Sequence, residues 1–142
     1  MIEFDIKESL INSSDLNAFE NNIGYKLPLD YKQHMLKYNG GAAKTTGVFF
    51  GKVEDDINLY YFHPLKNGSP TLEKMREITQ DFLPQNHISI ARTETGGISM
   101  SLGAQDSGSV FVYYPDQEPM KISNSFTELL EGLVDYGDDY DD

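Results

Sequence analysis

The chain has 142 residues, of which 23 are acidic and 11 basic, so its formal net charge is -12, and it contains no cysteine. This length suits one domain with a full hydrophobic core, and the lack of cysteine excludes disulfides, thiolate metal sites and thiol nucleophiles. The excess of carboxylates disfavours direct binding to nucleic-acid phosphates or anionic membranes, and leaves two explanations open, solubility or attraction of a basic protein partner.

The N-terminal segment MIEFDIKE carries acidic residues among apolar ones, and no window of the chain resembles an apolar membrane span. A secretory signal instead has a basic region followed by an apolar run, so we expect a cytoplasmic protein. Within this segment Ile2, Phe4 and Ile6 alternate with charged residues as in a strand, but Ile6, Leu10 and Ile11 also fit one helical face. Both structures remain possible for this segment.

The stretch KLPLDYKQHMLKYNGG, residues 26–41, predicts a helix that organises the fold. Pro28 has no N–H to leave unpaired in a first turn, and Asp30 places a negative charge near the positive end of the helix dipole. Asn39, Gly40 and Gly41 tolerate positive φ, which indicates a left-handed end to the helix.

The same predicted helix has apolar residues on two faces. At helical spacing, one face carries four of its residues: Tyr31, His34, Met35 and Tyr38. Leu29 and Leu36 lie on nearly the opposite face. We therefore expect neighbouring elements to cover this helix on two sides, with the ring of Tyr38 buried.

Capping residues predict two further helices in the first two thirds of the chain. Ser13 or Ser14 can cap a helix that Gly24 ends, and Ser69 can cap a helix that Pro70 opens. Both segments carry apolar residues at helical spacing, so each helix should pack one face on the rest of the domain.

The last predicted helix begins at Ser125. Ser125 and Glu128 form the Ser-x-x-Glu pattern of a capping box. Apolar residues then recur at helical spacing: Phe126, Leu129, Leu130, Leu133 and Val134. This pattern predicts a helix that continues through Val134.

Short aromatic and β-branched runs predict strands at residues 47–51, 59–63, 88–91, 98–102 and 110–114. The last three are joined by turns and should form an antiparallel meander. We therefore predict an α+β fold, with one domain (residues 1–136) whose largely antiparallel sheet has about five to six strands and helices packed against it. An acidic flexible tail (residues 137–142) should follow the domain.

No pattern in the sequence predicts catalysis. His34, His63 and His87 are scattered without the spacing of metal ligands, and the nucleophile-elbow, Walker A and dinucleotide-binding motifs are missing. We expect His34 to be a partly buried, hydrogen-bonded side chain. The prediction is therefore a protein with no catalytic, cofactor-binding or metal-binding residues, no cofactor and no enzymatic activity.

Nine residues are candidates for contact with a protein partner. They are acids in a connection and in the tail, and tyrosines in two predicted strands: Glu54, Asp55, Asp56, Asp138, Asp139, Tyr60, Tyr61, Tyr113 and Tyr114. Neighbours in a strand face opposite sides of the sheet, so one ring of each tyrosine pair should be core and the other can be exposed. A solvated turn and purely structural rings are the alternative explanations.

Three stretches in the same order resemble the SMI1/KNR4 (SUKH) family. They are Leu27-Pro28 with Tyr31-Lys32 and Tyr38-Asn39-Gly40-Gly41, then Ile90-Ala91 with Gly96-Gly97 and Gly108–Tyr114, and finally Ser125–Leu133. The resemblance implies an α+β domain with a largely antiparallel sheet. Bacterial proteins resembling this are mostly immunity proteins that neutralise a toxin domain, often a nuclease, whereas fungal relatives are linked to cell-wall synthesis. The matching residues are structural, so the resemblance transfers no binding residue.

These observations predict a non-enzymatic immunity protein that binds a cognate and basic toxin protein. We expect it to be a monomer or a weak homodimer that binds neither nucleic acid nor membranes. The alternatives are a regulatory scaffold related to cell-wall synthesis and, from another class, a small hydrolase.

Overall fold

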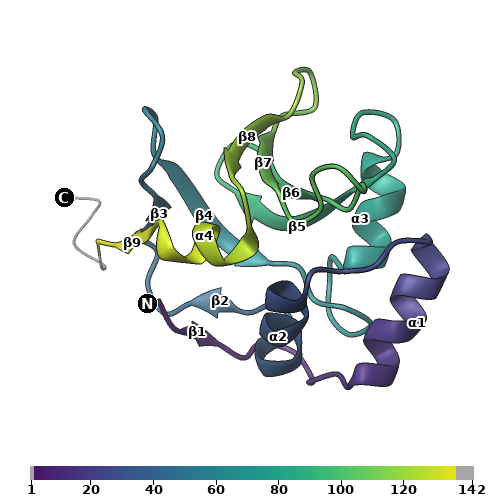
Figure 1. Ribbon diagram of the computed structural model, residues 1–142. Coiled ribbons are helices and arrows are strands. Elements are labelled where there is room, and N and C mark those ends of the chain that lie inside the picture. Colours follow the sequence, from purple (N-terminus) through teal and green to yellow (C-terminus); the bar gives the residue numbers. More distant parts are fainter. Residues whose placement is uncertain (1, 137–142) are drawn as a thin grey trace.

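The computed structural model describes residues 2–136, which form a strongly curved antiparallel sheet with helices packed beside it (Figure 1). The helices in this part of the chain are α1 (Ser13–Ile23), α2 (Leu29–Tyr38), α3 (Leu72–Thr79) and α4 (Phe126–Glu131). The strands are β1 (Phe4–Asp5), β2 (Ala42–Ala43), β3 (Val48–Phe50), β4 (Ile57–Phe62), β5 (His87–Thr93), β6 (Gly97–Ser101), β7 (Val110–Tyr113), β8 (Met120–Ser123) and β9 (Leu133–Asp135). The α+β class is therefore confirmed.

The large sheet has seven strands in the order β8-β7-β6-β5-β4-β3-β9, and β1 pairs separately with β2. All of these pairs are antiparallel. The predicted meander is confirmed, because Ile88 pairs with Met100 and Ile98 pairs with Val112. The predicted strand number is too low, since β2, β8 and β9 were not recognised. The sequence was compatible with either a strand or a helix in the N-terminal segment, and the structure shows the short strand β1 there.

The end of α4 differs from the sequence prediction. Ser125 caps the helix as expected, accepting a hydrogen bond from the Glu128 N–H at 3.0 Å. The helix ends at Glu131 and does not continue through Val134, and Gly132 lies so close to the Phe50 ring that a Cβ at this position would collide with it. The chain then becomes β9, in which Leu133 pairs with Phe50 of β3.

The predicted caps of α1 and α3 are each displaced along the chain. Asn12 caps α1, and its side chain and that of Asp15 each accept the other's backbone N–H at 3.0 Å. Thr71 caps α3 by accepting the Lys74 N–H at 3.1 Å, two residues after the expected Ser69. Asn12 and Thr71 are both residue types that are favoured at the N-cap of a helix. The sequence therefore predicted the two helices correctly but assigned each N-cap to a nearby residue.

Helix α2 is covered on one side only within the described residues. Tyr31 and Met35 are fully buried, whereas Leu29 on the opposite face is 69% exposed and Leu36 is also exposed. The expectation of two covered faces is therefore wrong. Tyr38 is only partly buried, because it lies at the edge of the contact, with the Lys37 ammonium 5.1 Å from its ring centroid.

An aromatic cluster joins α2, α4 and β4 at the centre of the core. The ring centroid of Phe126 lies 5.1 Å from that of Tyr31, 5.0 Å from that of His34 and 5.5 Å from that of Phe62. Phe4 of β1 contacts Phe62 from the other side at 5.4 Å. Edge-to-face contacts of this kind add to the energy of burial, so this cluster fixes α2 and α4 against β4 of the sheet.

Candidate partner interface

The end of the sheet formed by β9, β3 and β4 presents one face to solvent. Phe49 pairs with Val134 on one side and with Asn58 on the other, so these three side chains point to the same face. Alternation places Tyr136 and Tyr60 on that face too. The other face is core, since Phe50 and its neighbours there are buried. We call Phe49, Asn58, Tyr60, Val134 and Tyr136 the outer face.

Tyr136 shapes the outer face by lying over Phe49. Their ring centroids are 5.6 Å apart at an interplanar angle of 61°, and Phe49 is buried while Tyr136 remains 45% exposed. The Tyr136 hydroxyl donates a hydrogen bond to Asp56 Oδ2 at 3.3 Å, and its backbone N–H donates to the Gly47 carbonyl at 2.8 Å. Val134 beside it is 41% exposed. The outer face therefore carries exposed apolar surface held in position by hydrogen bonds.

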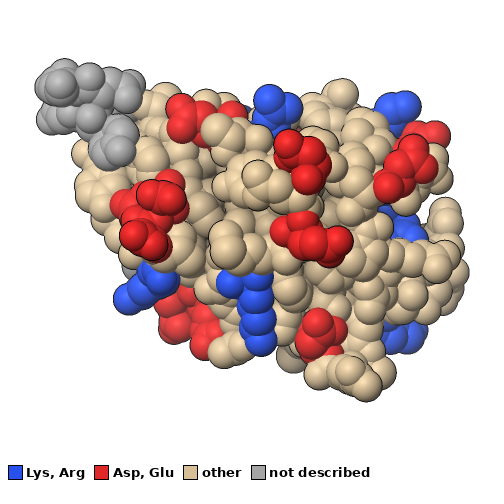
Figure 2. All heavy atoms as spheres, turned by 90° about the horizontal axis from the view of Figure 1, so that it is seen from above, with Lys and Arg blue, Asp and Glu red and all other residues tan. Residues whose placement is uncertain are grey.

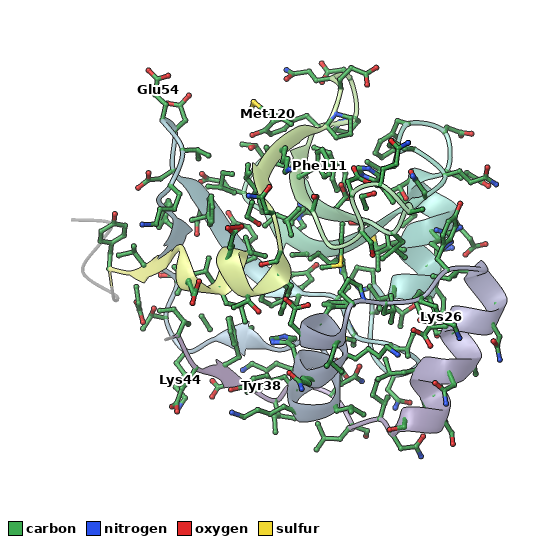
Figure 3. All side chains as sticks on the ribbon, in the orientation of Figure 1. Lys26, Tyr38, Lys44, Glu54, Phe111 and Met120 are labelled. Carbon is green, nitrogen blue, oxygen red and sulfur yellow. The ribbon has the colours of Figure 1, made fainter. Side chains whose placement is uncertain are left out.

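Three candidate acids border this apolar surface. Glu54, Asp55 and Asp56 are all exposed in the hairpin between β3 and β4, which also contains Lys52. Glu54 projects outward at the tip of that hairpin (Figure 3). On the upper face of the molecule the acidic side chains form several separate groups with basic groups beside them (Figure 2). The hairpin is therefore a local concentration of negative charge beside exposed apolar side chains.

A surface hollow of about 470 Å³ adjoins the outer face at Tyr60. Asn58, Lys44, Thr45 and Glu94 also line it, and Tyr60 is 44% exposed. Among the described residues Asn58 Oδ1 is a buried acceptor with no hydrogen-bond partner. An unpaired buried acceptor is unfavourable, but this oxygen has under 1 Å² of accessible surface, so a donor from outside the chain reaches it only if the side chains that cover it move aside.

The remaining candidate tyrosines are less accessible. Tyr113 is buried and its hydroxyl lies 2.6 Å from Ser89 Oγ, and burial raises the pKa of Tyr113. Tyr114 is half-buried against the core, so the second pair has the expected division into one core ring and one more accessible ring. The first pair does not, because neither Tyr60 nor Tyr61 is buried.

A β-bulge explains the environment of the first tyrosine pair. The pairing register between β4 and β5 shifts between Leu59 and Tyr61, so that Leu59 and Phe62 are both core residues although they are three positions apart. Strict alternation would have placed one of these two outside the core. The sequence alone gave no sign of the bulge.

The two candidate acids of the tail, Asp138 and Asp139, lie outside the described residues. The structure therefore places seven of the nine candidates, and it brings Asp56 into contact with Tyr136, which sequence reasoning had not selected. Val134, Tyr136 and Asn58 were all missed. Val134 and Tyr136, which are β-branched and aromatic and stand at every second position directly after Gly132, were the signal that could have revealed β9.

The three histidines are all buried. The His34 Nε2–H donates to the Gly40 carbonyl at 2.7 Å, which confirms the expected hydrogen bond, and the ring is buried where partial burial was expected. Burial lowers the pKa of His34 to about 4 and that of His63 to about 4, and it also lowers the pKa of His87. All three rings are therefore neutral near pH 7. Within residues 2–136 no group of three or more His, Asp or Glu side chains is placed to hold a metal ion.

Comparison with known proteins agrees with this architecture. The sequence profile of the SMI1 / KNR4 family (SUKH-1) matches residues 10–132. The chain belongs to the SMI1/KNR4 family. It is also 31% identical to the SPbeta prophage-derived uncharacterized protein YokK of Bacillus subtilis (strain 168), over 89% of this chain and 77% of that relative.

Membership of the SMI1/KNR4 family accounts for the three structural stretches in the sequence. The family match covers the helix α2, the meander and α4, and it ends at Gly132, just before β9. The outer face therefore combines strands inside the matched region with the segment that follows it. No helix in the described part of the chain is long and apolar enough to cross a membrane.

Proposed function

We propose that this SMI1/KNR4 protein is an immunity protein that binds a cognate toxin domain through the outer face and the acidic hairpin. The observation that carries the proposal is the position of exposed Val134, Tyr136 and Tyr60 beside the acids Glu54–Asp56, at one end of the sheet. The family fits such a role, and the related protein YokK is described as prophage-derived. The binding needs no cofactor and no enzymatic activity.

The chemistry of this surface suits a basic partner. Tyrosine rings supply large contact areas at low entropic cost and are frequent hot spots, whereas exposed acids at the rim mainly accelerate association and select the charge of the partner. Tyr136 is already held by Asp56 and Phe49, so little ordering is needed when it is covered. A toxin that cleaves nucleic acid has a basic active site, and the acidic hairpin is complementary to it.

The hollow beside Tyr60 provides a specific contact within this surface. The Tyr60 ring lines this hollow, and Asn58 Oδ1, which has under 1 Å² of accessible surface, can accept a hydrogen bond from a lysine or arginine of the partner once the side chains that cover it move aside. Such a bond satisfies an acceptor that is otherwise buried and unpaired in the described structure, so it should contribute more than an ordinary surface hydrogen bond.

The proposal is tested by growth rescue. The reading frame next to this one should encode a secreted protein with a basic C-terminal domain, and that domain is expressed in a sensitive host with or without this protein. We expect the unaltered protein to restore growth and the Tyr60→Ala/Tyr136→Ala double variant to fail. The matched control is Leu29→Ala/Leu36→Ala, which removes two exposed apolar side chains from α2 and should restore growth fully.

The opposite pattern of rescue would contradict the proposal. If the tyrosine variant protects and the leucine variant does not, the toxin binds α2 and not the outer face. If no neighbouring basic domain is bound at all, the immunity function itself is wrong, and a regulatory scaffold of cell-wall synthesis or a small hydrolase becomes the better hypothesis.

A further inference from the structure

A second hollow, of about 310 Å³, lies between α3 and the turn that joins β5 to β6. Met75, Ile78 and Phe82 provide an apolar wall, and Ala91 lies opposite on β5. Ile78 is exposed although it belongs to the apolar side of α3. The hollow contains no residue of the outer face, and its volume is in the range of small-molecule sites. Its walls are therefore suited to the apolar body of a ligand.

His63 supplies a buried polar group to this hollow. Its side chain is 1% exposed, and among the described residues Nδ1 has no hydrogen-bond partner. The ring is oriented by an edge contact with Tyr61, whose centroid lies 5.6 Å away. Burial lowers the pKa of His63 to about 4, against the effect of a hydrogen bond with the Pro70 backbone, so the ring is neutral at pH 7. Pro70 has no N–H, so the ring donates to its carbonyl, and because Nδ1 has no partner, Nε2 is the donor and Nδ1 an acceptor. Nδ1 has under 1 Å² of accessible surface, so a ligand hydroxyl can donate to it only after the side chains that cover it move aside.

Arg92 supplies a positive charge at the same hollow. Its guanidinium is exposed and forms no ion pair with any carboxylate in the described residues, although the chain has 23 acids. Burial is the main cause of the lowered pKa of His63 and the raised pKa of Tyr113, and the Arg92 charge adds to the first shift and opposes the second. Glu94 also lines the hollow. Arg92 is therefore the group in the lining that can pair with an anionic ligand.

We propose that this hollow binds a small hydroxyaryl carboxylic acid. The aromatic body lies between the α3 side chains and Ala91, the hydroxyl pairs with Nδ1 of His63, and the carboxylate pairs with Arg92. The hollow has an apolar wall, a buried nitrogen without a hydrogen-bond partner and a guanidinium without an ion pair among the described residues. A ligand of this class can contact all three of them at once. The inference does not depend on the toxin-binding function.

The test is an NMR titration of the ¹⁵N-labelled protein with 4-hydroxyphenylacetate. We expect saturable shifts of amides around the hollow, including Ile78, Ala91 and Gly96, with a dissociation constant of about 1 mM or below, which suits a ligand of this size. The ring nitrogens of His63 should shift as well, because the hydroxyl pairs with Nδ1. Phenylacetate, which lacks the hydroxyl, should bind at least about fivefold more weakly.

Two arginine variants separate the carboxylate contact from a general effect of charge. Arg92→Gln should weaken 4-hydroxyphenylacetate about fivefold and leave 4-hydroxyphenethyl alcohol, which has no carboxylate, unchanged. Arg76→Gln removes the other arginine of the chain, which does not line this hollow, and should leave both affinities unchanged.

Three outcomes would overturn the inference. The first is non-saturable or scattered shifts, which show that the hollow holds only water. The second is equal binding of phenylacetate, which removes the role of His63. The third is saturable binding of a tyrosine-containing peptide without binding of the free acids, which makes the hollow a contact for a protein side chain.

Discussion

The buried hydroxyl of Tyr31 has no hydrogen-bond partner among the described residues, and burial strongly raises the pKa of Tyr31. An unpaired buried hydroxyl costs about 1–3 kcal/mol in lost solvation. We therefore expect Tyr31→Phe to increase the free energy of unfolding by about 1 kcal/mol, as measured by urea denaturation. Few single substitutions stabilise a protein, so the sign of the change is informative.

Tyr113→Phe is the matched control. Its hydroxyl is paired with Ser89, so the same chemical change should lower the free energy of unfolding by about 1 kcal/mol. Equal destabilisation by the two variants would show that the Tyr31 hydroxyl has a partner in solution.

The neutral, buried histidines make stability depend on pH. His34 and His63 have folded-state pKa values of about 4, compared with the ordinary value of 6.5. Below pH 6.5 the unfolded chain takes up protons that the folded chain does not, so stability should fall as pH falls towards 4. Between pH 7.5 and pH 5 each histidine should remove about 2 kcal/mol from the free energy of unfolding.

Urea denaturation at these two pH values measures the effect. His34→Gln keeps a donor near the Gly40 carbonyl but does not titrate, so it should reduce the pH dependence by about half. Equal unfolding free energies of the original chain at pH 5 and pH 7.5 would show that these rings are open to solvent.

At the scale of elements, the end of α2 connects three segments through Asn39. This residue has φ of 44° and is fully buried. Its Nδ2 donates to the carbonyls of Ser9 and Leu65 at 2.9 and 3.1 Å, and its Oδ1 accepts the Leu65 N–H at 2.8 Å. The residue therefore joins the end of α2 to the N-terminal segment and to the loop that precedes α3.

Asn39→Gly keeps the backbone conformation but removes these three hydrogen bonds. We expect it to lower the free energy of unfolding by about 3 kcal/mol, because it leaves buried backbone groups unpaired. Gly24→Asn at the left-handed end of α1, where a Cβ meets open space, should change it by under about 1 kcal/mol. Similar effects of the two variants in thermal or urea unfolding would mean that Asn39 acts only through its conformation.

The elements that sequence reasoning recovered are those whose signals are local. Asn39, Gly40 and Gly41 all have positive φ as predicted, because the need for a left-handed end is visible in residue types alone. The error at β9 came from a contact between distant residues, since the chain after Gly132 pairs with β3 through Leu133 and Phe50. The bulge at Tyr61 is set by pairing with β5, so it too has no signal in its own segment.

The candidate site was predictable in part for the same reason. The acids of the hairpin follow from composition, and strand alternation predicted that one ring of each tyrosine pair is core and the other can be exposed, which holds for Tyr113 and Tyr114 but not for Tyr60 and Tyr61. The contact of Tyr136 with Asp56 and Phe49 joins residues about 80 positions apart in the chain and depends on β9 being a strand. Only the three-dimensional structure shows that these residues form one surface.

At the scale of the whole molecule, the acidic hairpin should act mainly on the rate of association. Replacing Glu54, Asp55 and Asp56 by Gln, Asn and Asn should slow association with a basic toxin domain by up to about tenfold at low salt, with a much smaller effect at 0.15 M. Dissociation should change little. Stopped-flow or surface-binding kinetics at two salt concentrations measure both rates.

The control for this experiment neutralises three exposed acids outside the outer face, Glu77, Asp81 and Asp116. It changes the net charge equally but should slow association less, because those charges lie away from the contact. Equal slowing by both triple variants would mean that the overall charge steers the partner and that the hairpin has no special role.

Hydrogen exchange of the protein bound to its toxin domain tests the central claim most directly. If the outer face is the contact, binding should protect backbone amides in the hairpin of residues 51–56 and in residues 133–136, and leave α1 and the exposed side of α2 unchanged. Protection confined to α1 and α2, with the hairpin and β9 exchanging as in the free protein, would contradict the account.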